Sequence, residues 1–358
     1  MLTQLSMTRV VNPRPGWYRG EFHAHTNFSD GVHPPPELAE LARAAGLDFF
    51  AITDHNTVEA FPHFGDTPNL LIIPGIEITM KEGHYNVFGL DGQFDWLPAV
   101  CSWPNELSGP MGSYQNASQL MAHAAGQGLL NSINHPLLPP WDWLDFTTDL
   151  RHLHCLEIFN DPTYADNDWA NPKAVDMWSR WLNAGYRVTA IGGTDYHQPQ
   201  LARGYNTPQR MGLAGTFVYA RELSGAAILE GLRRRQVYVS LGPQLTFEAA
   251  CNGEIHAIGA DLGRVDGQIS FTATVQHSAP VEARLVKNGD TLAVAQLADD
   301  TPWQHTEPVD AAQPAWFRLD LFDAGQRRLA VTNPIFTGPP VAPSPPHSYG
   351  AFVENAPN

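Results

Sequence analysis

The stretch Tyr18-Arg19-Gly20-Glu21-Phe22-His23-Ala24-His25 has the pattern of a β-strand that ends in two histidines. Residues two apart on a strand point to the same side, so both imidazoles can reach one metal ion. Six further short apolar runs are also predicted to be strands: 47–54, 70–78, 84–90, 129–134, 153–159 and 187–192. Segments with helical spacing lie between or after several of them: 36–45, 118–126, 172–184 and 224–234. This alternation predicts an α/β fold, a (β/α) barrel or a close variant.

Almost every predicted strand carries a histidine or a carboxylate at or near one end. Beyond the first two histidines, these residues are Asp30, Asp54, His55, Glu77, His84, His135, Glu157, Asp195 and His197. The rim formed by strand ends is where (β/α) barrels build their active sites. A single His-x-His or Asn-His-Pro sequence also occurs in ordinary turns and cores, and the remaining histidines are interpreted in that way. The convergence of so many ligand-type residues on one rim favours a metal site.

The composition narrows the class of protein further. The chain has 358 residues, a formal charge of −16, 15 His, 18 Arg and only 3 Lys. Such a negative charge argues against binding of long nucleic acid through its phosphates. Three widely spaced cysteines, Cys101, Cys155 and Cys251, argue against a disulfide framework and against a thiolate zinc site. A bound metal is therefore expected on His, Asp and Glu side chains.

Two further expectations concern location and the second half of the chain. The sequence shows no apolar signal-peptide core and no membrane-spanning run, which predicts a reducing, cytoplasmic protein without membrane contact; export by another route is the alternative. After residue 243, short alternating runs separated by turn residues predict a small immunoglobulin-like β-sandwich. The predicted runs are 245–249, 268–276, 282–287, 291–297, 315–322 and 329–336. The expected domains are 1–243, 244–338 and an extended Pro-rich tail at 339–358.

At this point the motifs carry a family resemblance. They are His23-x-His25-Thr26, Ser29-Asp30-Gly31, Thr53-Asp54-His55-Asn56, Gly75-x-Glu77, Asn134-His135-Pro136 and Asp195-x-His197. This ordered set resembles the PHP (polymerase and histidinol phosphatase) superfamily of metal-dependent phosphoesterases over about residues 17–243. The segment 83–89, the helix-like 227–233 and the stretch 332–335 are similar to its carbaryl-hydrolase-like (CehA/McbA) branch.

The resemblance implies a distorted (β/α)7 barrel that holds up to three divalent metal ions. The first ion would be held by His23, His25, Glu77 and Asp195. Glu77 would bridge to a second ion on His84 and His135. The third ion would be held by Asp30, His55 and His197. Nitrogen and oxygen ligands without thiolate suit Zn, Mn or Fe, and the sequence does not choose among them.

The chemistry that this implies is hydrolysis by a metal-bridged hydroxide, because divalent ions make water nucleophilic at neutral pH. Asp54 and Glu157 are expected behind the ligands, orienting them, with Glu157 as a ligand in the alternative. His197 or Asp54 could protonate a leaving group. Arg203 is a candidate contact for a phosphate; the alternative for Arg203 is a solvated loop residue.

The expected substrate is a small-molecule phosphoester. A carboxylic ester or an aryl carbamate is the alternative at the same site, because an activated water also attacks carbonyl carbon. Tryptophans in predicted loops could line an apolar pocket, or could simply pack: Trp96, Trp103, Trp141, Trp143 and Trp169. A non-catalytic metal-binding or interaction module is a second class of function. The expected partner is a small anionic or aromatic ester, and a homo-oligomer is left open.

Overall fold

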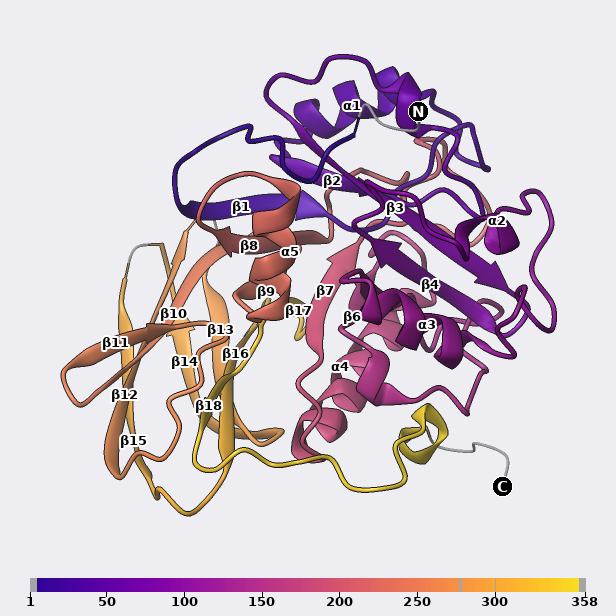
Figure 1. Ribbon diagram of the computed structural model, residues 1–358. Coiled ribbons are helices and arrows are strands. Elements are labelled where there is room, and N and C mark those ends of the chain that lie inside the picture. Colours follow the sequence, from indigo (N-terminus) through magenta and orange to yellow (C-terminus); the bar gives the residue numbers. More distant parts are fainter. Residues whose placement is uncertain (1–4, 277–278, 300, 354–358) are drawn as a thin grey trace.

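The computed structural model describes residues 5–276, 279–299 and 301–353. It shows an α/β fold whose second half is rich in β-sheet (Figure 1). The strands of the first half and their helices lie on one side of the molecule, and the later strands form two layers on the other. The large hydrophobic cluster of the first half also takes in Val286, Trp316, Val331 and Phe336 from the later strands. A second cluster lies mainly between the later strands and includes Phe217 and Tyr238 from the first half.

The seven strands predicted from the first half of the sequence correspond to the first seven strands of the structure. These are β1 (Gly16–Glu21), β2 (Phe49–Ile52), β3 (Leu71–Met80), β4 (Gly83–Phe88), β5 (Leu130–Ile133), β6 (Cys155–Asn160) and β7 (Thr189–Gly193). They are adjacent in that order, with β4 antiparallel to both β3 and β5 and the other neighbours parallel. Strands β2 to β7 are buried along their whole length, as is typical of strands covered on both faces.

Within the described residues, five α-helices and three short 3₁₀ helices accompany the strands. The α-helices are α1 (Pro35–Ala44), α2 (Leu97–Val100), α3 (Ala117–Gly126), α4 (Asn167–Asn183) and α5 (Gly225–Arg233); the 3₁₀ helices are η1 (Phe61–His63), η2 (Leu150–His152) and η3 (Tyr349–Phe352). Local sequence explains their starts. Asn116 caps α3 and Ser224 caps α5 through side-chain oxygens, and α1 begins with proline, whose missing N–H costs nothing there.

Two strands that the sequence did not predict extend the sheet beyond β1. They are β8 (Gly215–Ala220), antiparallel to β1, and β9 (Val237–Ser240), antiparallel to β8. In the described chain no backbone ladder joins β7 to β8 or β9. Instead the Thr216 hydroxyl bridges both backbone groups of Gly192 at 2.8 Å. The closed seven-unit barrel therefore stays a prediction, while the α/β class is shown.

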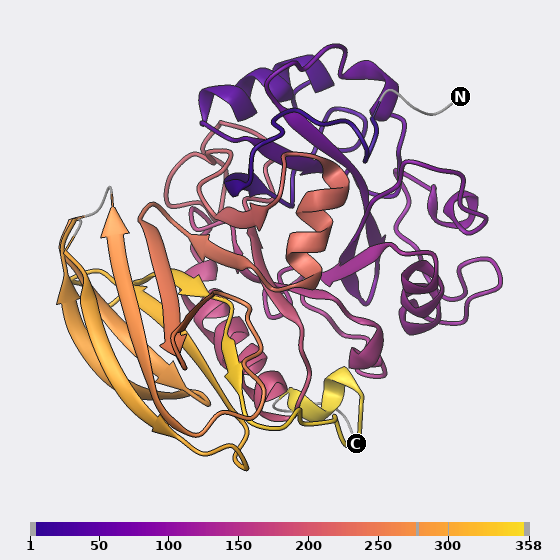
Figure 2. The same ribbon diagram turned by 60° about the vertical axis from the view of Figure 1, so that its left-hand side comes forward.

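The later strands form two facing layers (Figure 2). One layer has the order β11-β10-β12-β15, made of β11 (Glu254–Ala257), β10 (Gln244–Cys251), β12 (Gly267–Gln276) and β15 (Trp303–Val309). The other contains β14 (Asp290–Leu297), β13 (Val281–Lys287), β16 (Ala315–Phe322) and β17 (Arg328–Thr332), with β18 (Ile335–Thr337) beside β16. Buried and exposed residues alternate along β10, so its apolar face meets the opposite layer.

The second layer is continuous with the first sheet, because β17 pairs with β9. The sheet thus runs across the domain boundary predicted at residue 243. Asn333, fully buried, strengthens the junction: its side chain binds both backbone groups of Ala190 in β7 and the carbonyl of Val237 in β9. The immunoglobulin-like type and the predicted domain limits stay predictions.

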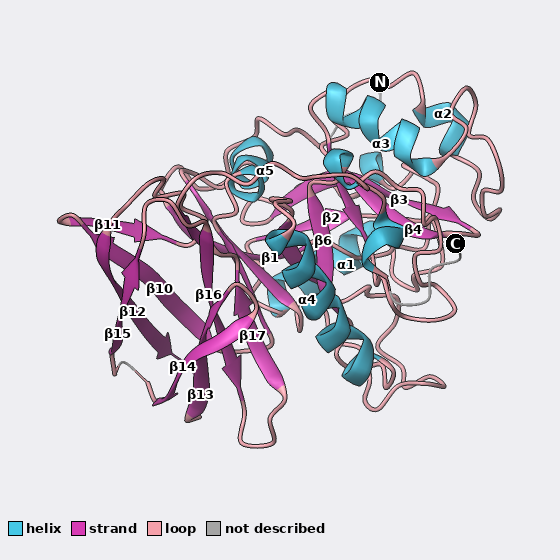
Figure 3. Ribbon diagram, turned by 90° about the horizontal axis from the view of Figure 1, so that it is seen from below, coloured by secondary structure: helices cyan, strands magenta, loops and turns pink. Residues whose placement is uncertain are grey.

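Helix α4 lies between the two halves (Figure 3), and the C-terminal segment runs past it, in yellow in Figure 1. This segment is extended up to about residue 348 and then turns into η3. There Tyr349 is fully buried and donates a hydrogen bond of 3.0 Å to the Pro136 carbonyl. The segment expected to be an extended tail is therefore anchored at Tyr349. Residues 354–358 lie outside the described part. No helix in the described ranges has the length and apolarity that a membrane span needs.

Candidate metal centre

The nine residues expected to bind metal lie together, and Glu77 is at their centre. Glu77 sits within β3 and is fully buried. Its Oε1 atom is 3.1 Å from His23 Nε2, 3.3 Å from His84 Nδ1 and 3.6 Å from His135 Nε2. Its Oε2 atom is 2.8 Å from His55 Nδ1 and 3.4 Å from His25 Nε2. One carboxylate therefore faces five imidazoles.

The first group of donor atoms is the one that the family resemblance implies. His23, His25, Glu77 and Asp195 place one donor atom each within 4.8 Å of one another. The Asp195 Oδ1 atom lies 3.1 Å from His23 Nε2 and 3.0 Å from His25 Nε2. Parallel pairing of β1 and β2 and the bridge between Ala24 and Tyr196 bring these strand ends together.

A second group consists of His25, Asp30, His55 and His197. Asp30 Oδ1 is 3.1 Å from His197 Nε2 and 3.5 Å from His55 Nε2. This group contains the three residues expected at the third ion, with His25 shared with the first group. Asp30 is the most exposed of them, so this group faces the solvent side of the site.

The third group differs from the expectation. It contains His55, Glu77 and His84, whereas the resemblance implies Glu77, His84 and His135. His135 remains next to Glu77, but its Nε2 atom lies farther out and its Nδ1 atom is 3.1 Å from the Trp141 carbonyl. His55 takes the closer position because the isolated bridge between His55 and Glu77 places it directly beside that carboxylate.

Two observations test whether these residues fit metal ions. Among the described residues, His23 Nε2, Glu77 Oε2 and His84 Nδ1 are buried and have no hydrogen-bond partner. Buried polar atoms without partners are costly unless a ligand such as a cation satisfies them. The donors are nitrogen and carboxylate oxygen atoms, which suit Zn, Mn or Fe. The residues therefore fit divalent metal ions.

Hydrogen bonds to the ring nitrogen that does not face the site orient some of the imidazoles, as is usual for metal ligands. His23 Nδ1 is 3.1 Å from Glu157 Oε1, and His197 Nδ1 is 2.7 Å from the Asp195 carbonyl. Burial, together with the charges of the neighbouring His197 and His55, lowers the pKa of His25 to about 3. His25 is thus held in the neutral form that a metal requires.

The charges of the carboxylates follow from the same neighbours. Burial raises the pKa of Glu77, but the charges of His23, His55 and His84 outweigh burial and hold that pKa well below its usual range. Asp195 is similar: burial is opposed by His23 and His197, and the pKa of its carboxyl is held well below normal. Both side chains are therefore anionic at neutral pH, as metal ligands are.

Glu157 and Asp54 hold other parts of the site in place. Glu157 Oε2 accepts hydrogen bonds from the His135 backbone N–H at 2.8 Å and from Asn160 at 3.1 Å. Asp54 accepts bonds from the Thr26 backbone N–H and hydroxyl, both at 2.6 Å, and from the Ser29 hydroxyl at 2.7 Å. Asp54 thereby supports the loop that carries Asp30.

The strand ends adopt a rare backbone conformation where they present the ligands. His135 has φ 26° and Asp195 has φ 50°, and neither is glycine. Left-handed backbone at such residues is costly and is found where the surroundings hold it in place, often at functional sites. Here Gln209 holds the Asp195 turn: its amide donates to the Asp195 carbonyl at 2.9 Å and accepts from the His197 N–H at 2.9 Å.

A cavity of about 290 Å³ opens onto the ligands, and its lining includes residues that the sequence did not single out. Asp161, Tyr164, Tyr205 and Gln209 line it together with Trp141. The sequence offered a reason to expect Asp161 at the site, because it comes just after the predicted strand 153–159. It offered no such reason for Tyr164, Tyr205 or Gln209. Burial raises the pKa of Asp161 to about 6. The described lining contains no Lys or Arg.

Two of the three catalytic candidates are not in this lining. His197 lines the cavity, whereas Asp54 is buried behind it. Arg203 is exposed in the loop after β7 and lies outside the lining. Among the predicted loop tryptophans, Trp141 lines the cavity and Trp103 stacks on His55 with ring centroids 5.4 Å apart, while Trp96 and Trp143 are buried in the core.

With this geometry in view, comparison with known proteins finds a similarity to the PHP domain in part of the chain. The PHP domain model matches residues 21–156, which include β2 to β5 and the ligand candidates from His23 to His135. Asp195 and His197 lie beyond the matched segment. The matched segment is therefore similar to a PHP domain, within an α/β fold that has several possible metal-binding clusters of His, Asp and Glu.

Particular relatives match smaller parts of the chain. A segment of 94 residues is 36% identical to the DNA polymerase III PolC-type of Streptococcus thermophilus, covering 25% of this chain and 6% of the polymerase. For the same polymerase of Streptococcus pneumoniae the identity is 29% over 142 residues, 38% of this chain and 10% of the polymerase. This chain therefore corresponds to only a small part of the curated relatives it matches.

Solved structures resemble the chain more distantly. A two-domain protein from Bacteroides vulgatus, described as containing a PHP-like metal-dependent phosphoesterase, is 20% identical with a TM-score of 0.48 and coverage of 93% of this chain and 99% of its own. An amidohydrolase from Chromobacterium violaceum with bound sulfate and no metal is 15% identical, with a TM-score of 0.38 and coverage of 54% and 91%.

Proposed function

We propose that this protein is a metal-dependent hydrolase that cleaves a small-molecule phosphoester at a centre of up to three divalent ions. The observation that carries the proposal is the position of Glu77. A fully buried carboxylate that faces five imidazoles, with unpartnered buried atoms among them, is costly in a core unless positive charge compensates it, and divalent ions would supply that charge. The cavity of about 290 Å³ gives a small substrate access to this cluster.

The chain offers ligands for each ion. His23, His25, Glu77 and Asp195 would hold the first; Glu77 with His84, and with His55 or His135, the second; Asp30, His55 and His197 the third. When bound, Zn, Mn or Fe would supply activation of water at neutral pH and polarisation of the ester.

The remaining steps belong to side chains of this chain. Glu157 and Gln209 keep the ligands oriented, so that little reorganisation accompanies reaction. His197 and Asp54 are the candidates for protonating a leaving group. Only His197 lines the cavity, and it would serve as the donor in a centre of two ions, where it does not hold the third. The described cavity lining contains no cationic side chain, and Arg203 lies outside it, so an anionic substrate would be recognised mainly at the ions.

A carboxylic ester or aryl carbamate is the second candidate substrate, in line with the carbaryl-hydrolase-like resemblance. Its support is the aromatic side of the cavity. The Tyr164 ring lies against Tyr205 at 5.1 Å and against Trp141 at 6.0 Å, both edge to face. Such a wall fits an aryl group on the leaving side of an ester. The net charge of −16 still argues against long nucleic acid as the substrate.

Two measurements test the proposal. Metal analysis of purified protein not exposed to chelator should find at least one equivalent of Zn, Mn or Fe; well below one equivalent would refute the enzyme and leave a non-catalytic module. A panel of para-nitrophenyl phosphate mono- and diesters, compared with naphthyl esters and carbamates, then identifies the bond. Turnover of the carboxyl esters alone would refute the phosphoester proposal in favour of the second candidate.

A further inference from the structure

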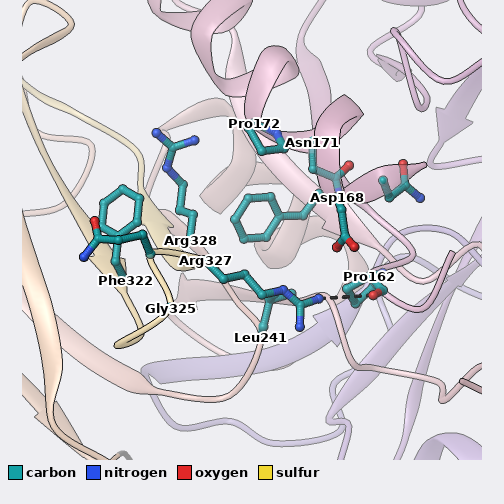
Figure 4. A pocket seen from close by; sticks show the side chains of 12 residues that line it. Pro162, Asp168, Asn171, Pro172, Leu241, Phe322, Gly325, Arg327 and Arg328 are labelled. Atoms are coloured by element: carbon teal, nitrogen blue, oxygen red, sulfur yellow. Dashed lines mark hydrogen bonds between the residues drawn. The ribbon is translucent and has the colours of Figure 1, made fainter. Parts of the chain in front are cut away.

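A second cavity, of about 430 Å³, lies where the β-sandwich meets the first half of the chain, and we name it the seam cavity (Figure 4). Its walls come from three places: the loop after β6 with the first turns of α4, Leu241 after β9, and the hairpin between β16 and β17. None of its lining residues lines the metal cavity. Its volume is within the range of small-molecule sites.

Apolar side chains form the body of the seam cavity. Phe159 and Phe322 are almost completely buried, and Leu241 is partly buried. Pro162 and Pro172 complete this lining. Figure 4 shows these groups around a common space, with polar ends of side chains at its edges. An apolar body with a few polar groups is the usual composition of a pocket for an organic ligand.

Two arginines line the seam cavity: Arg327 makes a positive edge beside Pro162, and Arg328 points to the other side, towards Phe322 (Figure 4). Arg328 is 3.3 Å from Asp320 Oδ2, but Arg318 already binds both oxygens of that carboxylate, at 2.8 and 3.1 Å. One carboxylate thus serves two cations. Arg327 donates to the Pro162 carbonyl at 3.1 Å and has no carboxylate partner in the described chain. Asp176 also attracts Arg328. The described lining itself still holds two guanidinium groups against the single carboxylate of Asp168, and this excess of positive charge suits a carboxylate ligand.

The opposite edge offers hydrogen-bond acceptors. Asn167 is buried, and its amide N–H₂ group donates to Asn160 Oδ1 and to the Asp161 carbonyl, both at 2.9 Å. Its Oδ1 atom is also buried and has no partner among the described residues. Asp168, one residue later on α4, lines the cavity as well. A buried acceptor without a donor is a cost that a ligand N–H or O–H would remove.

From these edges we propose that the seam cavity binds a small aromatic carboxylate that also carries an N–H or O–H donor. The carboxylate would lie at Arg327, and the ring against Phe159 and Leu241. The donor would bind Asn167 Oδ1. An aromatic amino acid and a hydroxylated aromatic acid share this chemistry, and the experiment below separates them.

The site is placed to affect the metal centre, because the two cavities share one loop. Asn171, which lines the seam cavity, exchanges hydrogen bonds with both backbone groups of Asn160 at 3.0 and 2.7 Å. Asn160 in turn donates to Glu157, which holds His23 at 3.1 Å. The binding proposal itself does not depend on the proposed function.

Isothermal titration calorimetry on the zinc-loaded full chain tests the proposal with two probes, L-phenylalanine and 4-hydroxyphenylacetate. We expect saturable one-to-one binding of at least one probe, and which one binds identifies the donor as ammonium or hydroxyl. The neutral 4-hydroxyphenylacetamide should bind about tenfold more weakly than its acid, or not at all, because it lacks the charge-assisted contact.

Variants place the probe in the seam cavity. Arg327→Gln should weaken binding about tenfold, and Leu241→Trp should abolish it by filling the space. Arg221→Gln, at a side chain 81% exposed and outside this lining, is the matched control and should bind as the wild type does. Circular dichroism and melting curves check folding; should Leu241→Trp not fold, the surface variant Arg327→Gln decides.

Three results would overturn the proposal. One is no saturable binding of either probe at millimolar concentration. Another is binding unchanged by Arg327→Gln, which would place the carboxylate elsewhere, most simply at the metal ions. The third is equal binding of the acid and the amide, which would remove the role of the positive edge.

Discussion

Replacing Glu157 by Gln should leave one imidazole of the metal centre wrongly arranged for metal binding, while the side-chain volume stays almost the same. Glu157 accepts three contacts: Oε2 from the His135 backbone N–H and from Asn160, and Oε1 from His23 Nδ1. A carboxylate can accept all three, whereas an amide has one acceptor end and one donor end. The two donors at Oε2 hold the glutamine oxygen there, so its N–H₂ group faces His23 Nδ1.

A proton on His23 Nδ1 would then meet another donor at about 3.1 Å, so the ring shifts its proton to Nε2. That atom faces Glu77 Oε1 and Asp195 Oδ1, each at 3.1 Å, in the first group of ligands. A protonated nitrogen does not bind metal. Loss of such an orienting partner typically weakens metal binding 10- to 100-fold, equivalent to about 1.4 to 2.7 kcal/mol.

The assay is zinc competition with a chromophoric chelator, together with metal content after dialysis. Glu157→Gln should lose about tenfold or more in affinity at one site, and nitrogen chemical shifts should show the changed tautomer of His23. Glu248→Gln, at an exposed position on β10, is the matched control. Wild-type affinity and metal content in a folded Glu157→Gln protein would refute the reasoning, because the structure gives His23 no other partner for its Nδ1 atom among the described residues.

Three further predictions rest on other contacts. Glu77→Ala should remove hydrolysis more completely than Arg203→Ala, because Glu77 faces five ligand imidazoles and Arg203 lies outside the cavity; equal losses in kcat/KM would contradict the bridging role. Asn333→Ala should lower the free energy of unfolding in urea by about 2 to 4 kcal/mol, because both backbone groups of Ala190 lose a buried partner; a change below about 1 kcal/mol would contradict this. Burial lowers the pKa of His154 to about 4, so stability should fall by about 1 to 3 kcal/mol as pH drops from about 6.5 to about 4, and His154→Asn should remove that part of the slope.

Much of the candidate site could be predicted from sequence because its residues sit at strand ends. Side chains two residues apart on a strand point to the same side, which places His23 and His25 together. Polar residues that follow a buried strand gather at the edge where that strand ends. The grouping of the ligands could not be predicted in full. His55 stands closer to Glu77 than His135 does because of a bridge between separate strands, which no local pattern reports.

Residues that reach the site from distant segments could not be recognised in the sequence. Gln209 and Tyr205 belong to the loop before β8, far from the predicted strand ends, and reach the cavity only after the chain folds. Strand β9 spans only four residues and was not predicted. Its pairing with β17 makes the two halves one sheet, an arrangement that depends on partners about ninety residues apart.

By itself the sequence determined the α/β class, the position of the second, strand-rich half and the set of ligand-type residues, because all three follow from short-range periodicity and from residue chemistry. Only the tertiary structure decided that the sheet is continuous across residue 243, that Tyr349 anchors the C-terminal segment, and that a second cavity lies at the seam. These features depend on contacts between segments distant in the chain, and their free energy comes from burial and hydrogen bonds that no local window contains.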